Sequence, residues 1–402
     1  MAYLPLANLL HHKLRSVLSA AGIGIGIFML LTLTGLSRGS LGEVADRWEA
    51  VNAELIVYPR DWGENITTLT GIGLSDRYAE KLRAWDPNLV RDVVPVFLWQ
   101  MRIGGQGHLA AGVDAAQWPA LVGGRKLSAG RPCDPGGEFA AWLEKKLLTP
   151  SDDPNTVLDI SPAELEARGG MELVIDDRLA RNGHLHAGDV VEAANHRWHI
   201  VGVVPAGGMT RVYMPRRTAQ FLFGSGSIGK STLLFVKLSA GAEPAKVATQ
   251  LHLATGQEVV QVSQYRQMLQ QKLGIMYVYV DAVNAIALVI SFLFIMVTLY
   301  TMVLQRTREI AILRSLGASR WYVLRGVLAE AMLLAGAGAG AGIALSFPSG
   351  WLIQTFSLYA VTITLPWVGI ALAAAAAGAL LAGLYPAWRA TKVDVVQALT
   401  LE

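Results

Sequence analysis

Residues 331–388 read AMLLAGAGAGAGIALSFPSGWLIQTFSLYAVTITLPWVGIALAAAAAGALLAGLYPAW, a run of 58 positions without an Asp, Glu, Lys or Arg. A helix of about 20 apolar residues crosses the hydrocarbon core of a bilayer, so this run is long enough for two crossings. The whole chain is 52% hydrophobic and 16% charged, whereas about a quarter of the residues in a soluble domain are charged. The composition therefore excludes a soluble protein and, because disorder needs low hydrophobicity, a disordered one.

Apolar runs elsewhere in the chain raise the expected number of membrane spans to four. We expect them at residues 16–37, 282–305, 321–345 and 367–386. The last two form a helical hairpin around a connection at residues 346–366, where Pro348 and Gly350 interrupt the helical pattern. A cleavable signal peptide is the alternative for the first span. Its apolar run exceeds the roughly 7 to 15 residues of a signal core, so we expect a retained helix.

Lysine and arginine next to the spans predict the orientation, because short cytoplasmic segments carry an excess of positive charge. This excess is found in the amphipathic N-terminal segment (1–15), in the segment between the second and third spans (306–320) and in the C-terminal tail (387–402). The connection at 346–366 has none. We therefore expect a multi-pass protein of the bacterial cytoplasmic (inner) membrane with both termini in the cytoplasm.

The segment at residues 38–281 then lies outside the cytoplasm. It holds 25 basic and 27 acidic residues, which is an ordinary soluble composition. Short apolar runs that alternate with helical patterns predict a large α+β domain of two subdomains, one of them inserted at about residues 110–225. Proline and glycine between residues 123 and 170 predict a loose loop there. The expected strands lie at residues 53–58, 93–99, 171–175, 190–193, 199–204 and 233–238, and the expected helices at 75–85 and 242–254.

Gly224 to Ser231 read GSGSIGKS, which matches the pattern of a phosphate-binding loop. Such a loop binds nucleotide only where a strand precedes it and a helix follows, because the amides at the helix start hold the phosphate. The residues that follow here, 232–238, read as a strand, and the loop lies on the side of the membrane that lacks ATP. We predict a hairpin connection without bound nucleotide. An intrinsic ATPase would rest on this loop alone.

Other chemistry-bearing residues give no strong pattern. His184 and His186 stand in an expected turn and His196 and His199 flank an expected strand start, so we predict no metal site. One cysteine, Cys133, excludes an internal disulfide. A net charge of +3 indicates no nucleic-acid partner.

Small residues inside the expected spans predict close helix packing. Glycines four positions apart allow two helix backbones to approach each other in a bilayer. Glu330 lies about two turns into the third span, where a carboxylate is costly unless it faces protein or water, so we expect it to face the bundle. The expected packing and dimer residues are Gly22, Gly26, Glu330, Gly338 and Gly342.

Residues 305–320 read QRTREIAILRSLGASR and predict a short amphipathic cytoplasmic helix that ends at Gly317. A helix lying on the membrane surface is one interpretation. Glu309, however, falls on the same stripe as Ile312 and Leu316, and a carboxylate on an apolar stripe favours docking to a cytoplasmic protein. The residues expected to couple to that partner are Arg306, Arg308, Glu309, Ile312, Leu313, Arg314, Leu316, Gly317 and Ser319.

From Arg308 to Ser319 the chain resembles the permease subunits of MacB/FtsX-like (type VII) ABC transporters, with their Arg-Glu-Ile-x-Ile-x-Arg/Lys-x-Leu-Gly-Ala-Ser type of signature. The resemblance continues at residues 6–18, 179–204 and 385–399, which are similar to the family's first span, extracytoplasmic domain and C-terminal end. Val395 departs from the pattern, because a proline often stands at this position in the family.

The resemblance implies a homodimeric permease that binds two cytoplasmic ABC ATPase subunits through the helix at 306–320. It also implies that ATP-driven closure of the ATPases moves the extracytoplasmic domains, a mode of action called mechanotransmission. The permease itself is then no enzyme and holds no cofactor, since ATP and magnesium bind the partner. Because the four spans and the large domain use up the chain, we expect the ATPase to be a separate polypeptide. A periplasmic adaptor or membrane-fusion protein is a further partner to test.

The substrate stays open between a lipid, a lipoprotein, a peptide, haem and another amphiphile, which the complex would export or extract. The alternative function is a signalling scaffold that switches on a periplasmic cell-wall hydrolase.

Overall fold

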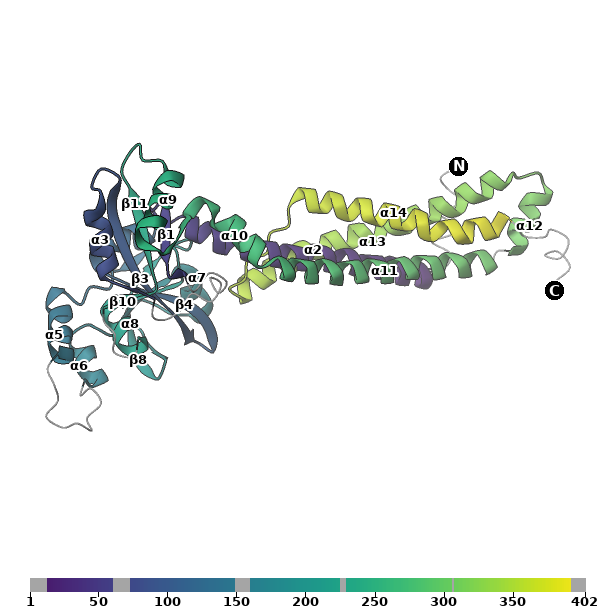
Figure 1. The fold of residues 1–402 in the computed structure, drawn as a ribbon. Coiled ribbons are helices and arrows are strands. Elements are labelled where there is room, and N and C mark those ends of the chain that lie inside the picture. Colours follow the sequence, from purple (N-terminus) through teal and green to yellow (C-terminus); the bar gives the residue numbers. More distant parts are fainter. Residues whose placement is uncertain (1–12, 61–72, 149–159, 225–228, 306, 392–402) are drawn as a thin grey trace, which may run out of the picture. The chain divides into compact units, whose positions relative to one another are not determined.

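The structure is a computed structural model of the chain, and it describes residues 13–60, 73–148, 160–224, 229–305 and 307–391. Contacts within the chain divide it into two compact units. The helical unit comprises the residues up to Ser40 and those from Gly274 onward, and the mixed unit comprises Leu41–Leu273. Helix α2 (Lys13–Glu49) contributes residues to both units (Figure 1).

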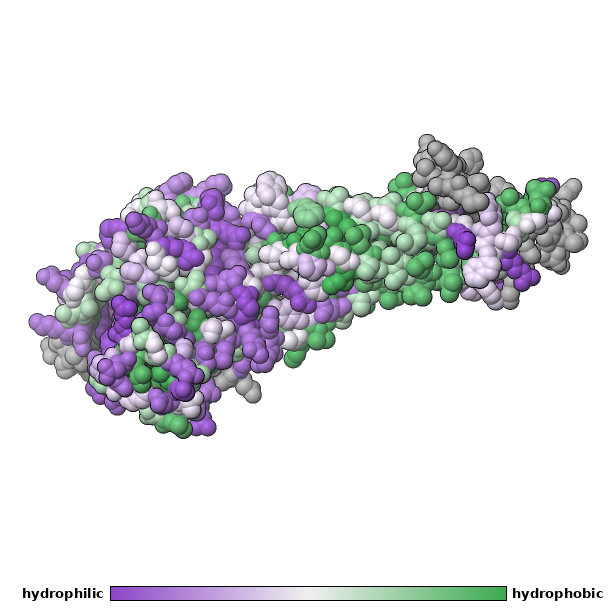
Figure 2. Space-filling view, turned by 90° about the horizontal axis from the view of Figure 1, so that it is seen from above, coloured by the Kyte–Doolittle hydropathy of each residue, from purple (hydrophilic) through white to green (hydrophobic). Residues whose placement is uncertain are grey.

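The described part of the helical unit contains four long helices. They are α2, α11 (Gly274–Gln305), α13 (Arg320–Phe356) and α14 (Leu365–Thr391), and the short α12 (Thr307–Ser315) follows α11 in the chain. All four are long and apolar enough to cross a membrane, where hydrogen bonds within the helix satisfy the backbone. Their outer surface is apolar (Figure 2), with exposed side chains such as Ile286 and Leu293. The four apolar helices expected from the sequence are therefore present.

The core of the helical unit consists of apolar side chains from these helices. Ile23, Ile27 and Leu31 of α2 are at most 2% exposed. They belong to one buried cluster with Leu299 of α11 and Ala379 of α14. The many alanines of α13 and α14 keep the interhelical distances short, as is usual where packing rather than water exclusion holds helices together.

The connection between the third and fourth spans is shorter than expected. Helix α13 continues through Pro348 to Phe356, so the connection covers residues 357–364 instead of 346–366. A proline removes one helical hydrogen bond, but membrane helices tolerate this loss where neighbouring groups compensate. Here the extended end of α13 packs on the connection, since a Cβ added at Gly350 would lie 3.2 Å from a side-chain carbon of Val361. This packing outweighs the helix-breaking tendency of the proline.

Among the described residues of the mixed unit, ten strands form one sheet, in the order β12-β1-β11-β3-β4-β9-β6-β8-β5 with β7 paired to β8. Their bounds are β1 (Leu55–Tyr58), β3 (Val90–Ile103), β4 (Gln106–Val113), β5 (Ala129–Gly130), β6 (Glu172–Asp176), β7 (Val190–Ala193), β8 (His196–Val204), β9 (Val212–Pro215), β11 (Leu233–Leu238) and β12 (Glu258–Gln261). Separately, β2 (Leu74–Ser75) pairs with β10 (Lys230–Ser231). The long β3 joins two halves of the sheet, because its first part pairs with β11 and its second with β4. The six strands predicted from the sequence correspond to β1, β3, β6, β7, β8 and β11.

Both faces of the β1–β11 half of the sheet are buried. Alternate residues of a strand point to opposite faces, and Val236 and Phe235 of β11 accordingly belong to different clusters. Val236 packs with Leu82 and Leu251, which come from α3 (Arg77–Trp85) and α9 (Pro244–Thr255). Phe235 packs on the other face with Trp48 of α2. The two helices predicted in this domain are α3 and α9.

Residues 114–211 are inserted between β4 and β9, which are parallel neighbours in the sheet. The insertion is thus shorter than the expected 110–225, because β9 and α8 (Arg216–Phe223) belong to the main sheet region. It contains η3 (Ala115–Gln117), α4 (Trp118–Leu121), α5 (Gly137–Leu148), α6 (Pro162–Ala167) and α7 (Asp177–Gly183). After α9 come η4 (Val262–Gln264) and α10 (Tyr265–Lys272).

The expected loose loop at residues 123–170 is partly helical. Besides α5 it contains α6, whose start is stabilised by a capping box between Ser161 and Glu164. Pro162 occupies the first turn, where its missing N–H breaks no helical hydrogen bond. Proline here marks a helix start, which the prediction overlooked. Residues 149–159 of the expected loop lie outside the described residues.

Candidate functional site

The helix predicted between the second and third spans is α12, and the turn that follows it is defined by local hydrogen bonds. Gly317 has a φ of +96°, which favours glycine. The N–H of Ala318 donates to the carbonyl oxygen of Leu313 at 3.0 Å, so the chain leaves the helix in a glycine-dependent turn. The hydroxyl of Ser319 then accepts from the N–H of Tyr322 at 3.2 Å and caps α13. Gly317 and Ser319 thus position α12 relative to α13 within the helical unit.

Helix α12 has one face buried in the helical unit and one face exposed. Ile310 is 8% exposed and packs in a cluster with Val303 of α11, Val323 and Val327 of α13, and Ala387 of α14. The exposed apolar residues are Ile312, Leu313 and Leu316, and Leu316 is 80% exposed. Neighbouring apolar side chains exposed at the end of a short helix are a candidate interaction surface. We name these three residues the α12 patch.

The charged residues predicted for this site are less well described. Arg308 lies in α12 and is exposed. Arg306 and the side chains of Glu309 and Arg314 lie outside the described residues.

The glycines predicted to pack lie where α2 meets two neighbouring helices, α13 and α11. A Cβ added at Gly338 of α13 would lie 2.5 Å from the carbonyl oxygen of Ala20, and one at Gly342 would lie 2.5 Å from that of Gly24. On α2 itself, Gly22 faces Phe294 of α11 and Gly26 faces Ser291 of the same helix. The glycines therefore allow α13 and α11 to approach α2 closely.

Glu330, the acidic residue of the third span, is 7% exposed and lies inside the helical unit. Such burial agrees with the expectation that a carboxylate at this depth faces protein.

Polar contacts between α2 and α11 were not predicted. Asn284 donates to the hydroxyl of Thr34 at 2.9 Å, Ser291 donates to the carbonyl oxygen of Gly22 at 3.1 Å, and Thr298 shares a short hydrogen bond with Ser19. The three α11 residues are seven positions apart. A seven-residue polar repeat in an apolar helix is typical of a face that meets another helix, so this spacing was the signal that could have identified them.

The described residues around Gly224–Ser231 do not form a phosphate-binding loop. Helix α8 precedes the segment and strands β10 and β11 follow it, so no helix N-terminus faces the loop from its C-terminal side. The hydroxyl of Ser231 donates to a carboxylate oxygen of Asp76 at 2.6 Å. A phosphate-binding loop would use this hydroxyl for magnesium. Residues 225–228 lie outside the described residues.

The histidines weighed as metal ligands have other local roles. His184 takes a left-handed conformation at the end of α7, His186 lies in the following turn, and His196 and His199 belong to β8. His199 bonds to Glu166 at 2.5 Å. Within the described ranges, no three His, Cys, Asp or Glu side chains are grouped so that they could hold a metal ion.

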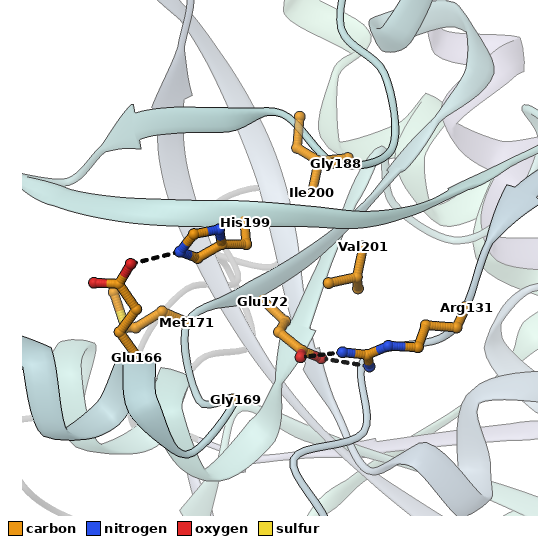
Figure 3. A pocket seen from close by; sticks show the side chains of 9 residues that line it. All are labelled: Arg131, Glu166, Gly169, Met171, Glu172, Gly188, His199, Ile200 and Val201. Carbon is orange, nitrogen blue, oxygen red and sulfur yellow. Dashed lines mark hydrogen bonds and ion pairs between the residues drawn. The ribbon is translucent and has the colours of Figure 1, made fainter.

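A cavity of about 490 Å³ lies in the inserted segment (Figure 3). Arg131 pairs with both carboxylate oxygens of Glu172, at 2.9 and 2.5 Å, and His199 pairs with Glu166. The hydrogen bond from His199 lowers the pKa of Glu166. These side chains therefore already satisfy one another's hydrogen bonds without a ligand.

His108 in β4 is a buried histidine close to other charges. It is 4% exposed, and its Nε2 has no hydrogen-bond partner in the described part of the chain. Burial lowers its pKa below 6.5 and outweighs a backbone hydrogen bond with Ile103, which raises it. Arg211 lowers this pKa further, and Asp176 raises it. The folded state therefore holds a neutral His108 at pH values where the unfolded chain binds a proton.

This burial predicts that acid destabilises the mixed unit. A lowered folded pKa gives full stability above the unfolded value near 6.5, and stability falls as the pH drops through the interval down to the folded pKa. We expect His108→Phe to remove this decline, and His186→Phe, at a side chain that is 82% exposed, to keep it. Urea unfolding of the full chain in detergent, followed by tryptophan fluorescence between about pH 7.5 and 5.5, measures the difference. An unchanged decline in His108→Phe would contradict the assignment.

Comparison with known families decides the identity. A family described as FtsX-like permease C-terminal matches residues 282–395, and one described as MacB-like periplasmic core domain matches residues 16–253, which is more than half of the chain. The chain belongs to the MacB/FtsX-like ABC transporter permeases. The first match contains most of α11 and all of α12, α13 and α14 of this permease, and the second contains most of α2 and of the mixed unit.

Relatives of this permease include larger proteins. It is 23% identical over 419 residues to the macrolide export ATP-binding/permease protein MacB of Shewanella oneidensis, covering 97% of this chain and 59% of that protein. The MacB protein of Bradyrhizobium diazoefficiens is 25% identical, covering 99% of this chain and again 59% of the relative. The pyoverdine export ATP-binding/permease protein PvdT of Pseudomonas syringae is 37% identical over 121 residues, covering 30% of this chain and 18% of that protein. The permease thus spans about 59% of the length of its MacB relatives.

Solved structures with partial likeness to this permease include two extracytoplasmic domains. The periplasmic region of MacB from Actinobacillus actinomycetemcomitans has a TM-score of 0.35 and 13% identity, covering 55% of this chain and 94% of that one. The extracellular domain of the transporter YknZ from Gram-positive bacteria has a TM-score of 0.32 and 15% identity, covering 52% of this chain and 98% of that one.

Proposed function

We propose that this permease is the membrane subunit of an ABC exporter, in which a separate cytoplasmic ATPase drives movement of the mixed unit on the other side of the membrane. Two ATPase subunits would bind a permease homodimer in the bacterial inner membrane, with both permease termini in the cytoplasm. The cargo would be a lipid, lipoprotein, peptide or other amphiphile that is exported or extracted. The single observation that carries the proposal is the α12 patch.

The α12 patch suits a protein partner because α12 is held firmly while its outer face stays uncovered. Ile310 fastens the helix to α11, α13 and α14, so a force applied to α12 is passed directly to these helices. Leu316 is 80% exposed beside the turn at Gly317. An apolar side chain that enters a groove on a partner contributes strongly to binding. Glu309 shares the stripe in the sequence, which disfavours a helix that merely lies on lipid.

The polar contacts inside the helical unit support movement of whole helices rather than a solute path through them. Asn284, Ser291 and Thr298 are all used in hydrogen bonds to α2. Polar side chains that line a substrate pathway would instead face a water-filled space. The work of the ATPase would then be done outside the membrane, as mechanotransmission. A periplasmic adaptor would be a further partner.

A substitution in the α12 patch tests the proposal. We expect Leu316→Asp to weaken ATPase binding by at least about tenfold, because it places a charge where the bound ATPase would bury an apolar side chain. Stimulated ATP hydrolysis in the reconstituted complex should fall with it. The assays are retention of the ATPase by the tagged permease and ATP hydrolysis in lipid nanodiscs.

The matched control is Leu253→Asp, the same change at a leucine of α9 that is 78% exposed. It should leave binding and hydrolysis unchanged. Normal ATPase retention by Leu316→Asp would show that α12 is not the docking site. Co-purification with a cell-wall hydrolase, without any cargo, would instead favour the signalling scaffold.

A further inference from the structure

The C-terminal end of α2 places a charged side chain inside the mixed unit. Arg47 is 5% exposed. Its guanidinium donates to Glu43 at 2.8 and 3.0 Å, to Asp176 at 3.0 Å and to the carbonyl oxygen of Gly208 at 3.2 Å. A buried guanidinium is stable only when its donors are matched by acceptors in this way.

Two further arginines extend these contacts. Arg178 and Arg211 each donate to Glu43 at 2.9 Å, and Arg211 also lies 3.3 Å from Asp176. We name the five residues Glu43, Arg47, Asp176, Arg178 and Arg211 the Arg47 network. It holds two carboxylates and three guanidiniums, so each carboxylate pairs with more than one arginine and loses a charge-assisted contact when Arg47 is removed.

The partners of α2 in the Arg47 network come from the centre of the sheet. Asp176 is the last residue of β6 and also caps α7, because its other carboxylate oxygen accepts from the N–H of Leu179 at 2.7 Å. Arg211 directly precedes β9, which pairs with β6. A displacement of Arg47 therefore acts on β6, which lies within the inserted segment, and on β9, which directly follows it.

The same end of α2 also has an apolar contact and a second ionic one. Trp48 stacks on Tyr265 of α10, with ring centroids 4.4 Å apart. Arg266 of α10 pairs with Asp46 and lies 3.3 Å from Glu49. Apolar contact is non-directional and permits sliding, whereas charge-assisted hydrogen bonds fix both distance and angle. Of these three contacts of the α2 end, the Arg47 network is the one that is both buried and built from charge-assisted hydrogen bonds.

We propose that the Arg47 network is a mechanical joint, which makes the C-terminal end of α2 move as one body with β6, α7 and β9. In the exporter this joint would pass displacement of α2 into the mixed unit, a role that rests on the proposed function. The joint itself does not, because it is a property of the folded chain.

Hydrogen exchange tests the joint without the ATPase. Two variants of the full chain are compared with the wild type in lipid nanodiscs. Arg47→Met keeps most of the length of the side chain, and Asp176→Asn keeps the oxygen that caps α7. In both variants the backbone amides of residues 44–49 should exchange at least about tenfold faster than in the wild type, because a broken buried pair lowers the free energy of local opening. Amides of β11 should stay protected, showing that the sheet is folded.

The matched control is Arg131→Met, which breaks another ion pair with a buried carboxylate but does not touch α2. It should leave residues 44–49 unchanged. Wild-type protection of these amides in both Arg47→Met and Asp176→Asn would overturn the joint.

A second measurement tests whether the joint transmits displacement of α2 to the mixed unit. A spin label at His186→Cys, on a side chain that is 82% exposed, reports the distance between the two copies in complexes with the ABC ATPase, with and without ATP. Cys133 is buried and burial raises the pKa of its thiol, so the label is selective. The wild type and Arg131→Met should show an ATP-dependent change, and Arg47→Met should lose most of it while ATP hydrolysis continues.

If Arg47→Met kept the full ATP-dependent change in the spin-label distance, the joint would not transmit displacement. A wild type without any change would overturn the proposed function instead, and the exchange result alone would then decide whether the joint exists.

Discussion

Replacing Gly338 by leucine is expected to separate α13 from α2 and to unfold the helical unit. A Cβ at this position would lie 2.5 Å from the carbonyl oxygen of Ala20 and 2.7 Å from the Cβ of Ile23. The first of these atoms is backbone, so it cannot rotate away, and the two helices must move apart. Overpacking costs about 1–3 kcal/mol and occasionally more, and a clash with backbone puts Gly338 at the upper end of this range. In a bilayer the loss is not offset, because close packing is the main force that holds such helices together.

Gly340 supplies a control on the same helix. A Cβ there meets nothing within 4 Å, so Gly340→Leu should change the stability of the helical unit by no more than about 0.5 kcal/mol. Unfolding of both variants by SDS titration in mixed micelles compares the two positions under identical conditions. Equal losses at Gly338 and Gly340 would show that the packing of α13 on α2 is wrong.

The sequence predicted those features of this permease that depend on neighbouring residues. An apolar run without charge leaves a helix as the stable form in a bilayer, and all four such runs are helical in the structure. Gly317 ends α12 because the local chain needs a positive φ there. Strands such as β7 and β11 were predicted with the bounds they have, because a short run of β-branched and apolar residues between turns indicates a strand.

Features that depend on distant residues could not be predicted. The helix-breaking tendency of Pro348 is local, whereas the packing of Gly350 on the connection is not. The Arg47 network brings residues 43, 176 and 211 together, and these positions share no spacing in the sequence. In the site, the sequence pattern alone could not show that Ile310 is buried and Leu316 exposed, because both are apolar residues of one short segment, in α12 and directly after it.

Replacing Arg216 by methionine is expected to cause the largest loss of stability in the mixed unit. The side chain of Arg216 is 7% exposed and lies 2.5 Å from Asp76 and 2.7 Å from Asp114. Methionine has a side chain of similar volume and is compatible with the start of α8. It leaves Asp114 without this partner, and among the described residues Asp76 keeps one ion pair, with the more distant Arg217 at 3.3 Å. Removing one member of a buried ion pair costs about 3–5 kcal/mol, and we expect a loss at the lower end of this range because Asp76 is 18% and Asp114 37% exposed.

Urea unfolding of the full chain in detergent measures this loss, since seven of the eleven tryptophans lie between residues 41 and 273 and report on the mixed unit. Lys246→Met removes a surface pair with Glu243, whose two side chains are 76% and 57% exposed, and should change stability by no more than about 0.5 kcal/mol. Asp76 also accepts from Ser231, so the loss of Arg216 should in addition speed hydrogen exchange at β10. A variant as stable as Lys246→Met would mean that the Asp76 and Asp114 carboxylates are solvated in the folded state, and that Arg216 holds neither α8 nor β10 in place.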